Sequence, residues 1–273
     1  LTILLPVWNE AKILEQKLEN LVETCQDFKP NLVIIDSAST DDSVSIIERW
    51  NGKNSFPSFQ LLRMDERKGK TAAVKQALEH INHSLKSDLI LMTDADALFE
   101  SNTVYNLLKW FSDSSIGCVG ATPKRIGQRM EEAGHRSMFS MVRTFESRID
   151  STPFLEGSCM MWRSDALDSN ALNINSNADD AQIATNVRIQ GLRVIQDADT
   201  HFIDHAPQQR KEHSRQKVRR AQGLQRHLLR QRNHWFNRRH GRFAAILRQE
   251  AALHLLTPLL LVGAFVAMLA RWA

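Results

Sequence analysis

Two kinds of segment alternate along the first 120 residues. Short apolar runs with no polar face are typical of strands that are buried on both sides, and they lie at residues 1–7, 32–35, 59–62, 89–93 and 116–121. Between them, apolar residues recur three or four positions apart, as in amphipathic helices, at residues 11–24, 41–50, 70–81 and 102–111. This alternation predicts an α/β fold built from βαβ units on a mostly parallel sheet.

The second half of the chain is less regular. Residues 131–149 predict an amphipathic helix whose apolar face packs on its own domain, the commoner case, or lies on a membrane surface. Residues 154–162 predict an edge strand, and residues 193–196 and 201–203 predict two short strands. A further helix is expected to begin at Asp179-Asp180 and to end at Gly191, which serves as its C-cap.

Charge and hydropathy change abruptly after residue 207. The net charge of the 273-residue chain is only +4, yet residues 208–249 hold thirteen Lys or Arg and one acid. A long Arg-rich helix is predicted over residues 208–239. Residues 251–270 contain no Asp, Glu, Lys or Arg, and a helix of this length covers a hydrocarbon layer of roughly 30 Å. We therefore predict a transmembrane helix with the α/β domain on the cytoplasmic side; a buried core helix is the alternative.

The chain thus divides into an α/β domain at residues 1–207, a basic interfacial helical segment at 208–250 and a transmembrane helix at 251–273. It starts at Leu1, already inside an apolar strand, so we expect a fragment of a longer protein. The three cysteines are far apart and form no disulfide framework or zinc spacing, which fits a reducing compartment.

Two carboxylates follow the fourth strand, in Asp94-Ala95-Asp96. In an extended segment they point to the same side, at the edge of the sheet where open α/β folds bind ligands. Such a pair is repulsive unless a cation or substrate groups lie between its members. Mg²⁺ or Mn²⁺ bridging phosphate oxygens suits this arrangement, and a simple turn is the alternative.

Other loops at the same edge carry groups that suit a nucleotide diphosphate. Glu10 and Asp36 are candidates to bind the edge of a base, and Lys70 is placed to meet the diphosphate, although Asp36 in a turn and Lys70 on the surface are ordinary features. Asp179-Asp180 forms a second acidic site. Its acids either complement the dipole at a helix N-terminus or include a general base for an acceptor hydroxyl.

Seven short motifs occur in order between residue 1 and about residue 223: Leu5-Pro-Val-Trp-Asn-Glu10, Ile34-Ile-Asp-Ser-Ala-Ser-Thr-Asp41, Arg67-Lys-Gly-Lys70, Thr93-Asp-Ala-Asp96, Glu156-Gly-Ser158, Ala178-Asp-Asp180 and Gln216-Lys-Val-Arg-Arg220. Their order and spacing resemble those of the family 2 glycosyltransferases, which have the GT-A nucleotide-sugar-binding fold. Within that family the chain is similar to the membrane-associated group that includes cellulose and hyaluronan synthases.

The resemblance implies an inverting, metal-dependent transfer of a sugar from a UDP- or GDP-linked donor to a lipid-linked or glycan acceptor at the membrane. Membrane lipid would be a partner and nucleic acid would not. The implied roles are Asp180 as catalytic base; Asp96 and Asp94 for Mg²⁺ or Mn²⁺; Pro6, Asn9, Glu10, Asp36, Lys70 and Asp94 for the donor; and Gly157, Ser158, Gln216, Arg219 and Arg220 for the diphosphate and acceptor.

Three positions depart from the family pattern, and two other functions remain as alternatives. Ser37 stands where an acid or amide is frequent after Asp36. Arg220 stands where processive synthases have a Trp that stacks on the acceptor sugar, and Asp179 stands where Glu is usual. A nucleotidyltransferase of similar fold is one alternative, but the loop at residues 5–11 lacks the Gly-rich sequence expected of it. A basic nucleic-acid-binding protein is the other, and it predicts salt-sensitive binding by residues 208–249.

Overall fold

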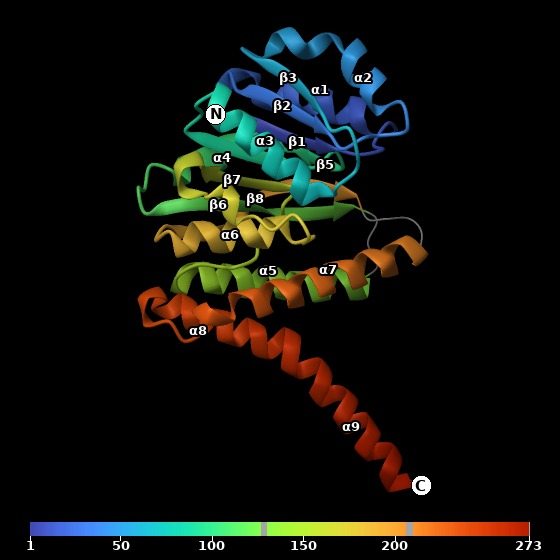
Figure 1. Ribbon diagram of the computed structural model, residues 1–273, viewed down its shortest axis with the longest axis vertical. Coiled ribbons are helices and arrows are strands. Elements are labelled where there is room, and N and C mark those ends of the chain that lie inside the picture. The colour runs from blue at the N-terminus through green and yellow to red at the C-terminus, as the bar shows by residue number, and fades with distance from the viewer. Residues whose placement is uncertain (127–129, 206–209, 273) are drawn as a thin grey trace.

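The computed structural model describes residues 1–126, 130–205 and 210–272. Within these ranges, helices cover both faces of one eight-stranded sheet (Figure 1). The strands are β1 (Thr2–Val7), β2 (Asn31–Asp36), β3 (Phe59–Arg63), β4 (Leu89–Thr93), β5 (Ala97–Phe99), β6 (Ile116–Ile126), β7 (Cys159–Arg163) and β8 (Arg193–His205). The helices are α1 (Leu14–Cys25), α2 (Ser43–Arg49), α3 (Lys70–Ser84), α4 (Thr103–Trp110), α5 (Met130–Ile149), α6 (Asp179–Ile189), α7 (Arg210–Arg230), α8 (Arg242–Ala251) and α9 (Thr257–Trp272).

The predicted βα repeats form the parallel half of the sheet, in the order β3-β2-β1-β4. β1, β2 and β4 are buried on both faces, whereas the edge strand β3 is half-buried. On β1, Ile3 and Leu5 pack with residues of α1, α2 and α4, whereas Leu4 packs with residues of α3 and α6. Because the strands are parallel, the loops that follow β1, β2 and β4 lie at one edge, as the sequence predicts.

Two strands run against the others, which the sequence pattern did not predict. β7 pairs antiparallel with both β4 and β6, so the expectation of an edge strand at residues 154–162 is wrong, and Trp162 is fully buried. β5, which sequence reasoning missed, pairs antiparallel with β8. The two short strands expected at residues 193–196 and 201–203 are parts of one strand, β8. β8 pairs in parallel with β6, and the register shifts between Ile116 and Cys118 and between Gly120 and Thr122.

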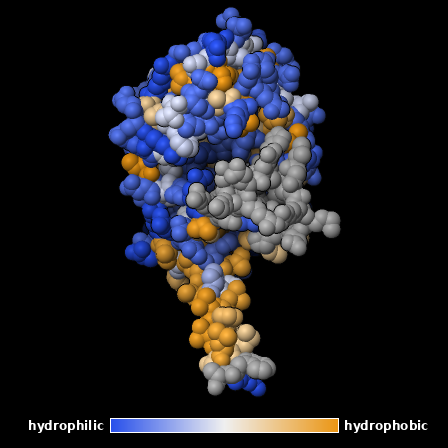
Figure 2. Space-filling model, turned by 90° about the vertical axis from the view of Figure 1, so that its right-hand side faces the viewer, coloured by the Kyte–Doolittle hydropathy of each residue, from blue (hydrophilic) through white to orange (hydrophobic). Residues whose placement is uncertain are grey.

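Helices α5, α7 and α8 lie below the sheet and α6, and α9 projects from this base (Figure 1). The predicted helix over residues 208–239 is shorter, because α7 ends at Arg230 and α8 begins at Arg242, after Gly241 with a φ of +54°. A π-helical turn, Ala252–Leu256, joins α8 to α9. The apolar window of the continuous helix Arg242–Arg271 has no buried residues, and Figure 2 shows a hydrophobic column below a mostly hydrophilic body. A buried core helix is therefore the wrong interpretation.

A pair of buried acids joins α5 to the start of this long helix. Glu146 of α5 is 6% exposed and accepts a hydrogen bond from Thr152 Oγ1 at 2.7 Å. Its carboxyl also hydrogen-bonds Glu250 of α8, whose Oε2 lies 3.0 Å from Nε2 of His254. Burial, and next the Glu250 carboxyl, raise the pKa of Glu146 to about 9. The junction therefore holds a proton at neutral pH.

This proton makes the stability of the fold depend on pH. The Glu146 carboxyl ordinarily titrates near 4.5 but titrates near 9 in the folded protein. Its stabilising contribution is therefore complete below about pH 4.5 and is lost as the pH rises toward about 9. In the wild type, Tm should therefore fall as the pH rises between these two values. We expect the share of this fall that is due to Glu146 to be absent in Glu146→Gln, measured by thermal unfolding in detergent. The exposed Glu23→Gln is the matched control, and a slope unchanged in Glu146→Gln would contradict the prediction.

Candidate active site

The ends of β1, β2 and β4 bring the predicted acidic residues together at one edge of the sheet. Val7 is paired with Asp36 in the register of β1 and β2, and Glu10 follows three residues after Val7. Glu10 interacts electrostatically with Asp94 and Asp96, which follow β4. Burial, and next the charges of Asp96 and Asp94, raise the pKa of Glu10 to about 7. Three carboxyl groups crowded together in this way attract a cation.

Asp36 presents an unpartnered oxygen at this edge. Its side chain is 3% exposed, and Oδ2 accepts a hydrogen bond from the backbone N–H of Ser39 at 3.0 Å. Among the described residues, neither Asp36 Oδ1 nor the buried hydroxyl of Ser37 has a hydrogen-bond partner. Buried polar atoms rarely remain unpaired, because their desolvation is then uncompensated. The pair is suited to the polar edge of a nucleobase.

Asn9 braces the β1 loop against the β2 loop. Its backbone adopts a φ of +56°, its Oδ1 accepts from the N–H of Thr40 at 2.7 Å, and its own N–H donates to Ser39 Oγ at 2.9 Å. Pro6 lies inside β1, beside Ile35 of β2. Both residues therefore shape the loops that carry Glu10 and Asp36.

Sequence reasoning missed an aromatic residue on the same loop. Trp8 is 37% exposed, and the guanidinium of Arg67 lies 3.2 Å from the centroid of its ring. Arg67 belongs to the segment before α3, so this cation–π contact links that segment to the β1 loop. An aromatic side chain directly after a buried strand was the available signal, because such a position faces the ligand edge of the sheet.

Lys70 joins the first acidic site to the second. It is the first residue of α3, after Gly69 with a φ of +93°. Its Nζ lies 2.6 Å from Asp94 Oδ1 and 3.4 Å from Asp179 Oδ2. Burial opposes the charge of Lys70, but the carboxylates of Asp179 and Asp94 outweigh it, and the pKa of Lys70 is raised. The ammonium is therefore a fixed cation between the two sites.

Asp94 and Asp96 lie in different surroundings. Burial works to raise the pKa of Asp94, but Lys70 and a 3.0 Å hydrogen bond from Ser158 Oγ outweigh it and lower that pKa. The Asp96 residue is exposed, but its carboxyl group is partly desolvated by the surrounding protein. This desolvation, and next the charge of Asp94, raise the pKa of Asp96. Both oxygens of Asp94 already have partners in the protein, whereas Asp96 faces outward.

A buried lysine supports the turn that carries these two acids. Lys17 of α1 is 0% exposed, and burial lowers its pKa to about 8. Its Nζ donates to Thr93 Oγ1 at 2.8 Å and to the carbonyl of Ala97, and lies 4.0 Å from the Phe99 ring centroid. Thr93 and Ala97 immediately flank the acidic turn, so Lys17 fixes both of its ends.

Replacing Lys17 by Met removes both hydrogen bonds but keeps an apolar chain of similar length. We expect a folded protein that needs about 10- to 100-fold more Mn²⁺ for half-maximal activity, the usual cost of losing support for metal ligands. The measurement is an Mn²⁺ titration of turnover, with the exposed Lys12→Met as control. A lower Tm with an unchanged Mn²⁺ requirement would show that Lys17 acts on stability alone.

The second acidic site lies at the N-terminus of α6. Asp180 accepts a 2.7 Å hydrogen bond from the N–H of Ala181, and burial, followed by the charge of Asp179, raises its pKa to about 6. Gly157 lies against it, because a Cβ there would be 3.2 Å from the Cβ of Asp180. The neighbouring Glu156 accepts a 2.8 Å hydrogen bond from Arg143 of α5, which sequence reasoning did not select.

Of the three residues predicted on α7, Arg220 is within electrostatic reach of the acidic turn. Its charge works to lower the pKa of both Asp94 and Asp96. Arg219 and Arg220 are both exposed. The side chain of Gln216 lies outside the described residues.

Comparison with known proteins places this site in a family. A model of glycosyl transferase family 2 matches residues 2–170. The chain belongs to this family. Membership favours glycosyl transfer over the nucleotidyltransferase and nucleic-acid-binding alternatives.

Solved structures show that this family 2 chain has the GT-A fold. Mannosyltransferase PcManGT from Pyrobaculum calidifontis, solved with GDP-Man and Mn²⁺, superposes with a TM-score of 0.85 at 30% identity, over 98% of this chain and 74% of that one. Staphylococcus aureus TarS 1-349 in complex with UDP-GlcNAc gives 0.66 at 16% identity, over 93% of this chain and 71% of that one. Poly-beta-1,6-N-acetyl-D-glucosamine synthase of S. aureus (strain COL) is 21% identical over 201 residues, which are 71% of this chain. The chain spans about half, 47%, of that relative's length.

The carboxylates at this site fit a divalent metal ion whose other ligands are phosphate oxygens. The described residues contain no group of three or more His, Cys, Asp or Glu able to hold an ion by themselves. Asp96 and Asp94 offer hard carboxylate oxygens, and Mg²⁺ and Mn²⁺ accept few protein ligands when phosphates and waters complete the shell. The residues present therefore fit a divalent ion bound together with a nucleotide diphosphate.

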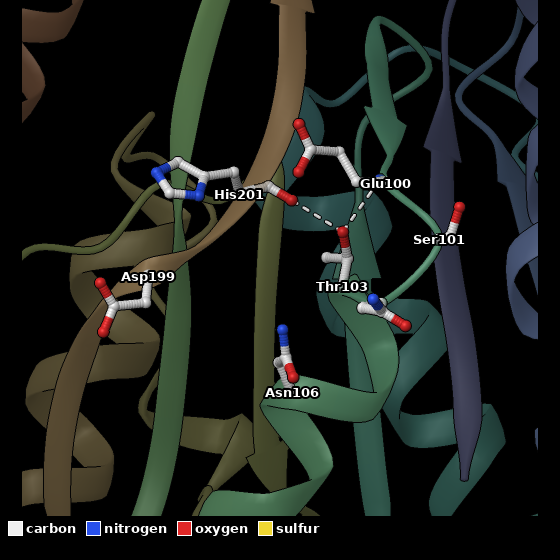
Figure 3. Close-up of a pocket in the computed structure, with 7 residues that line it drawn as sticks. Glu100, Ser101, Thr103, Asn106, Asp199 and His201 are labelled. Atoms are coloured by element: carbon white, nitrogen blue, oxygen red, sulfur yellow. Dashed lines mark hydrogen bonds between the residues drawn. The ribbon is translucent and has the colours of Figure 1, made fainter.

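A separate polar pocket of about 250 Å³ lies at the other end of β5, lined by Glu100, Ser101, Asn102, Thr103, Asn106, Asp199 and His201. Figure 3 shows Thr103 in its wall, where Oγ1 donates to the carbonyl of His201 at 2.7 Å and accepts from the N–H of Glu100 at 2.9 Å. β5 separates this pocket from the acidic turn, because Asp96 precedes the strand and Glu100 follows it.

Proposed function

We propose that the chain transfers a sugar from a nucleotide diphosphate to a hydroxyl group of a lipid-linked or glycan acceptor at the membrane, with inversion at the anomeric carbon. The observation that carries the proposal is the line of groups from the orphaned oxygen of Asp36, through Asp94, Asp96 and Lys70, to Asp180. A one-step displacement needs a site for the nucleobase, then a site for the metal-bound diphosphate, and then a group that accepts the proton of the acceptor.

The donor occupies the edge of the sheet in this proposal. Asp36 and Ser37 receive the base, while Pro6 and Asn9 hold the loops around the nucleoside. Lys70 and Asp94 face the diphosphate, with Glu10 beside them. Asp96, assisted by Asp94, would hold Mg²⁺ or Mn²⁺, which when bound neutralises the leaving diphosphate so that it needs no proton.

The acceptor approaches from the side of β7, α6 and α7. Gly157 leaves space beside Asp180, Ser158 steadies Asp94, and Arg220 adds positive charge near the diphosphate. Gln216 and Arg219, on the same helix, would complete this boundary. Asp180 takes the acceptor proton, since a carboxyl with a pKa near 6 is ionised at neutral pH and still basic enough to accept it.

Membranes or detergent extracts that contain the chain, incubated with radiolabelled nucleotide sugars and Mn²⁺, test this function. GDP-mannose is the first donor to try, because the similar mannosyltransferase was solved with it, and UDP-GlcNAc is the second. The expected result is label transferred to a lipid-extractable or glycan product. Labelled nucleotide sugar that is neither hydrolysed nor transferred, across UDP- and GDP-linked donors, would overturn the proposal.

We further infer that residues 251–273 anchor residues 1–207 and the basic segment 208–250 to the cytoplasmic face of a membrane. The continuous helix Arg242–Arg271 is long and apolar enough to cross a bilayer, and the basic residues that precede it follow the positive-inside rule. We expect the chain to remain with membranes through a 1 M salt wash, as a bilayer span predicts, and to leave in detergent. Release by salt alone would instead show an electrostatic attachment.

A further inference from the structure

Helix α5 has its polar side toward the protein and its apolar side outward. On the inner side, Ser140 Oγ accepts from Gln196 Nε2 at 2.9 Å, and Ser147 Oγ accepts from the N–H of Gln196 at 2.9 Å. Arg143 and Glu146 also point inward, to Glu156 and Thr152. This is the reverse of a helix that covers a soluble domain. The expectation that the apolar face of residues 131–149 packs on its own domain is therefore wrong for most of that face, although Phe139 contacts His254.

The outer side carries a stripe of four large apolar residues, Met138, Met141, Phe145 and Ile149, which are 49%, 53%, 53% and 52% exposed. Their spacing of three, four and four residues keeps them on one face of the helix. We call them the α5 stripe. A contiguous apolar stripe of this kind marks a surface that meets a partner.

The neighbours of the stripe identify the partner as a lipid bilayer. Phe139 of α5 stacks on His254 with ring centroids 6.0 Å apart, and Glu146 hydrogen-bonds Glu250, so α5 is fixed to the root of the proposed span. From there the exposed apolar surface continues through Leu253 and Leu256 into α9. α5 runs across the base of the molecule, whereas α9 leads away from it (Figure 1).

Charge at the base agrees with an anionic lipid surface. The Arg148 guanidinium lies 5.9 Å from the centroid of Phe145, at the border of the stripe. Between α7 and α8, Phe236 is 76% exposed, and its ring centroid lies 5.3 Å from the Arg248 guanidinium. Aromatic rings paired with arginines are suited to the interface between acyl chains and phosphate headgroups.

We propose that α5 is a second, in-plane membrane contact, in which the α5 stripe lies in the boundary between headgroups and acyl chains of an anionic bilayer. This inference rests on the proposed membrane attachment through α9. The inner side of the same helix carries Arg143, which holds Glu156 beside Gly157, and Gly157 lies against Asp180. Docking of α5 therefore fixes the height of the proposed base above the bilayer, so that an acceptor group at headgroup level meets it.

Site-directed spin labelling of the full chain tests the proposal. Cys25, Cys118 and Cys159 are fully buried, so a nitroxide reacts selectively with a new cysteine. The test variants are Phe145→Cys and Ile149→Cys. The control is Tyr105→Cys on α4, where the native residue is 52% exposed and lies away from the base. Each is reconstituted into vesicles of three parts phosphatidylcholine to one part phosphatidylglycerol.

We expect the nitroxides at 145 and 149 to collide more often with dissolved oxygen than with a water-soluble nickel chelate. This ratio should correspond to a depth of about 5–10 Å in the bilayer. The label at 105 should show the opposite order. Free access of the chelate at 145 and 149 overturns the proposal, and exclusion of both reagents overturns it in favour of a protein partner such as a second copy of the chain. Flotation of the vesicles is scored first, because a chain that does not float contradicts the attachment through α9. The proposed glycosyl transfer is tested separately by its own assay, since the spin-label measurement needs neither donor nor acceptor.

Discussion

An Asp96→Asn variant is expected to lose at least about 10³-fold in turnover while keeping its fold. A divalent ion contributes several kcal/mol of charge stabilisation in the transition state, and each 1.4 kcal/mol is about tenfold in rate. Asp96 is the acid of the pair that faces outward, while both oxygens of Asp94 bind Lys70 and Ser158. Asparagine has nearly the same shape but lacks the charge that draws Mn²⁺ or Mg²⁺ to the diphosphate.

The measurements for Asp96→Asn are turnover across an Mn²⁺ titration and Tm without metal. Because Asp96 is exposed, the substitution should leave Tm near that of the wild type, and excess Mn²⁺ should restore only part of the rate. The control is Asp199→Asn, an exposed acid in the separate polar pocket. Wild-type turnover by Asp96→Asn, or full turnover by the wild type in excess chelator, would contradict a metal at this position.

The sequence predicted the parallel half of the fold and its acidic edge because both depend on local patterns. Each apolar run in the first 93 residues is followed by a helix-spaced segment or by the acidic turn itself, and a right-handed βαβ connection leaves little choice of neighbour. The convergence of Glu10 with Asp94 and Asp96 then follows from parallel strands that end at one edge.

The order of the remaining strands was not predictable in this way. β7 lies between β4 and β6, and each of these pairings joins segments tens of residues apart through antiparallel contacts. The apolar run at residues 159–162 has the same composition in a central strand and in an edge strand. β5 has only three residues, too few for any periodicity.

Supporting residues were missed because their roles depend on tertiary contacts. Lys17 occupies a position that belongs to the buried side of α1, where a charge conflicts with the helix pattern. That conflict was the available signal, since a lysine on a buried face needs partners. Arg143 likewise lies on the polar side of α5, and the polar side of a helix is ordinarily assigned to solvent. In the structure Arg143 instead donates a hydrogen bond to Glu156, so the polar side of α5 faces the protein.

Asp180→Asn separates a catalytic base from an acid that only stabilises a helix N-terminus. The side chain accepts a hydrogen bond from the adjacent N–H of Ala181, and asparagine can keep this contact. If Asp180 only stabilises α6, the variant should lose at most about 1 kcal/mol of folding stability and retain its rate. If Asp180 is the base, turnover should fall roughly 10²- to 10⁴-fold, because the acceptor proton then has no acceptor.

The pH profile gives a second, independent measure of the role of Asp180. Burial and the neighbouring Asp179 raise the pKa of Asp180 to about 6, and a base must be ionised to act. Wild-type turnover should therefore rise with pH through about 6 and level off above it, and the residual activity of Asp180→Asn should lack this limb. Asp179→Asn is the matched control. Its carboxylate lies 3.4 Å from Lys70, so that variant should weaken donor binding, whereas Asp180→Asn should bind the nucleotide diphosphate as the wild type does. Near-wild-type turnover by Asp180→Asn would assign the base to another acid, with Asp179 and Glu156 as the next positions to replace.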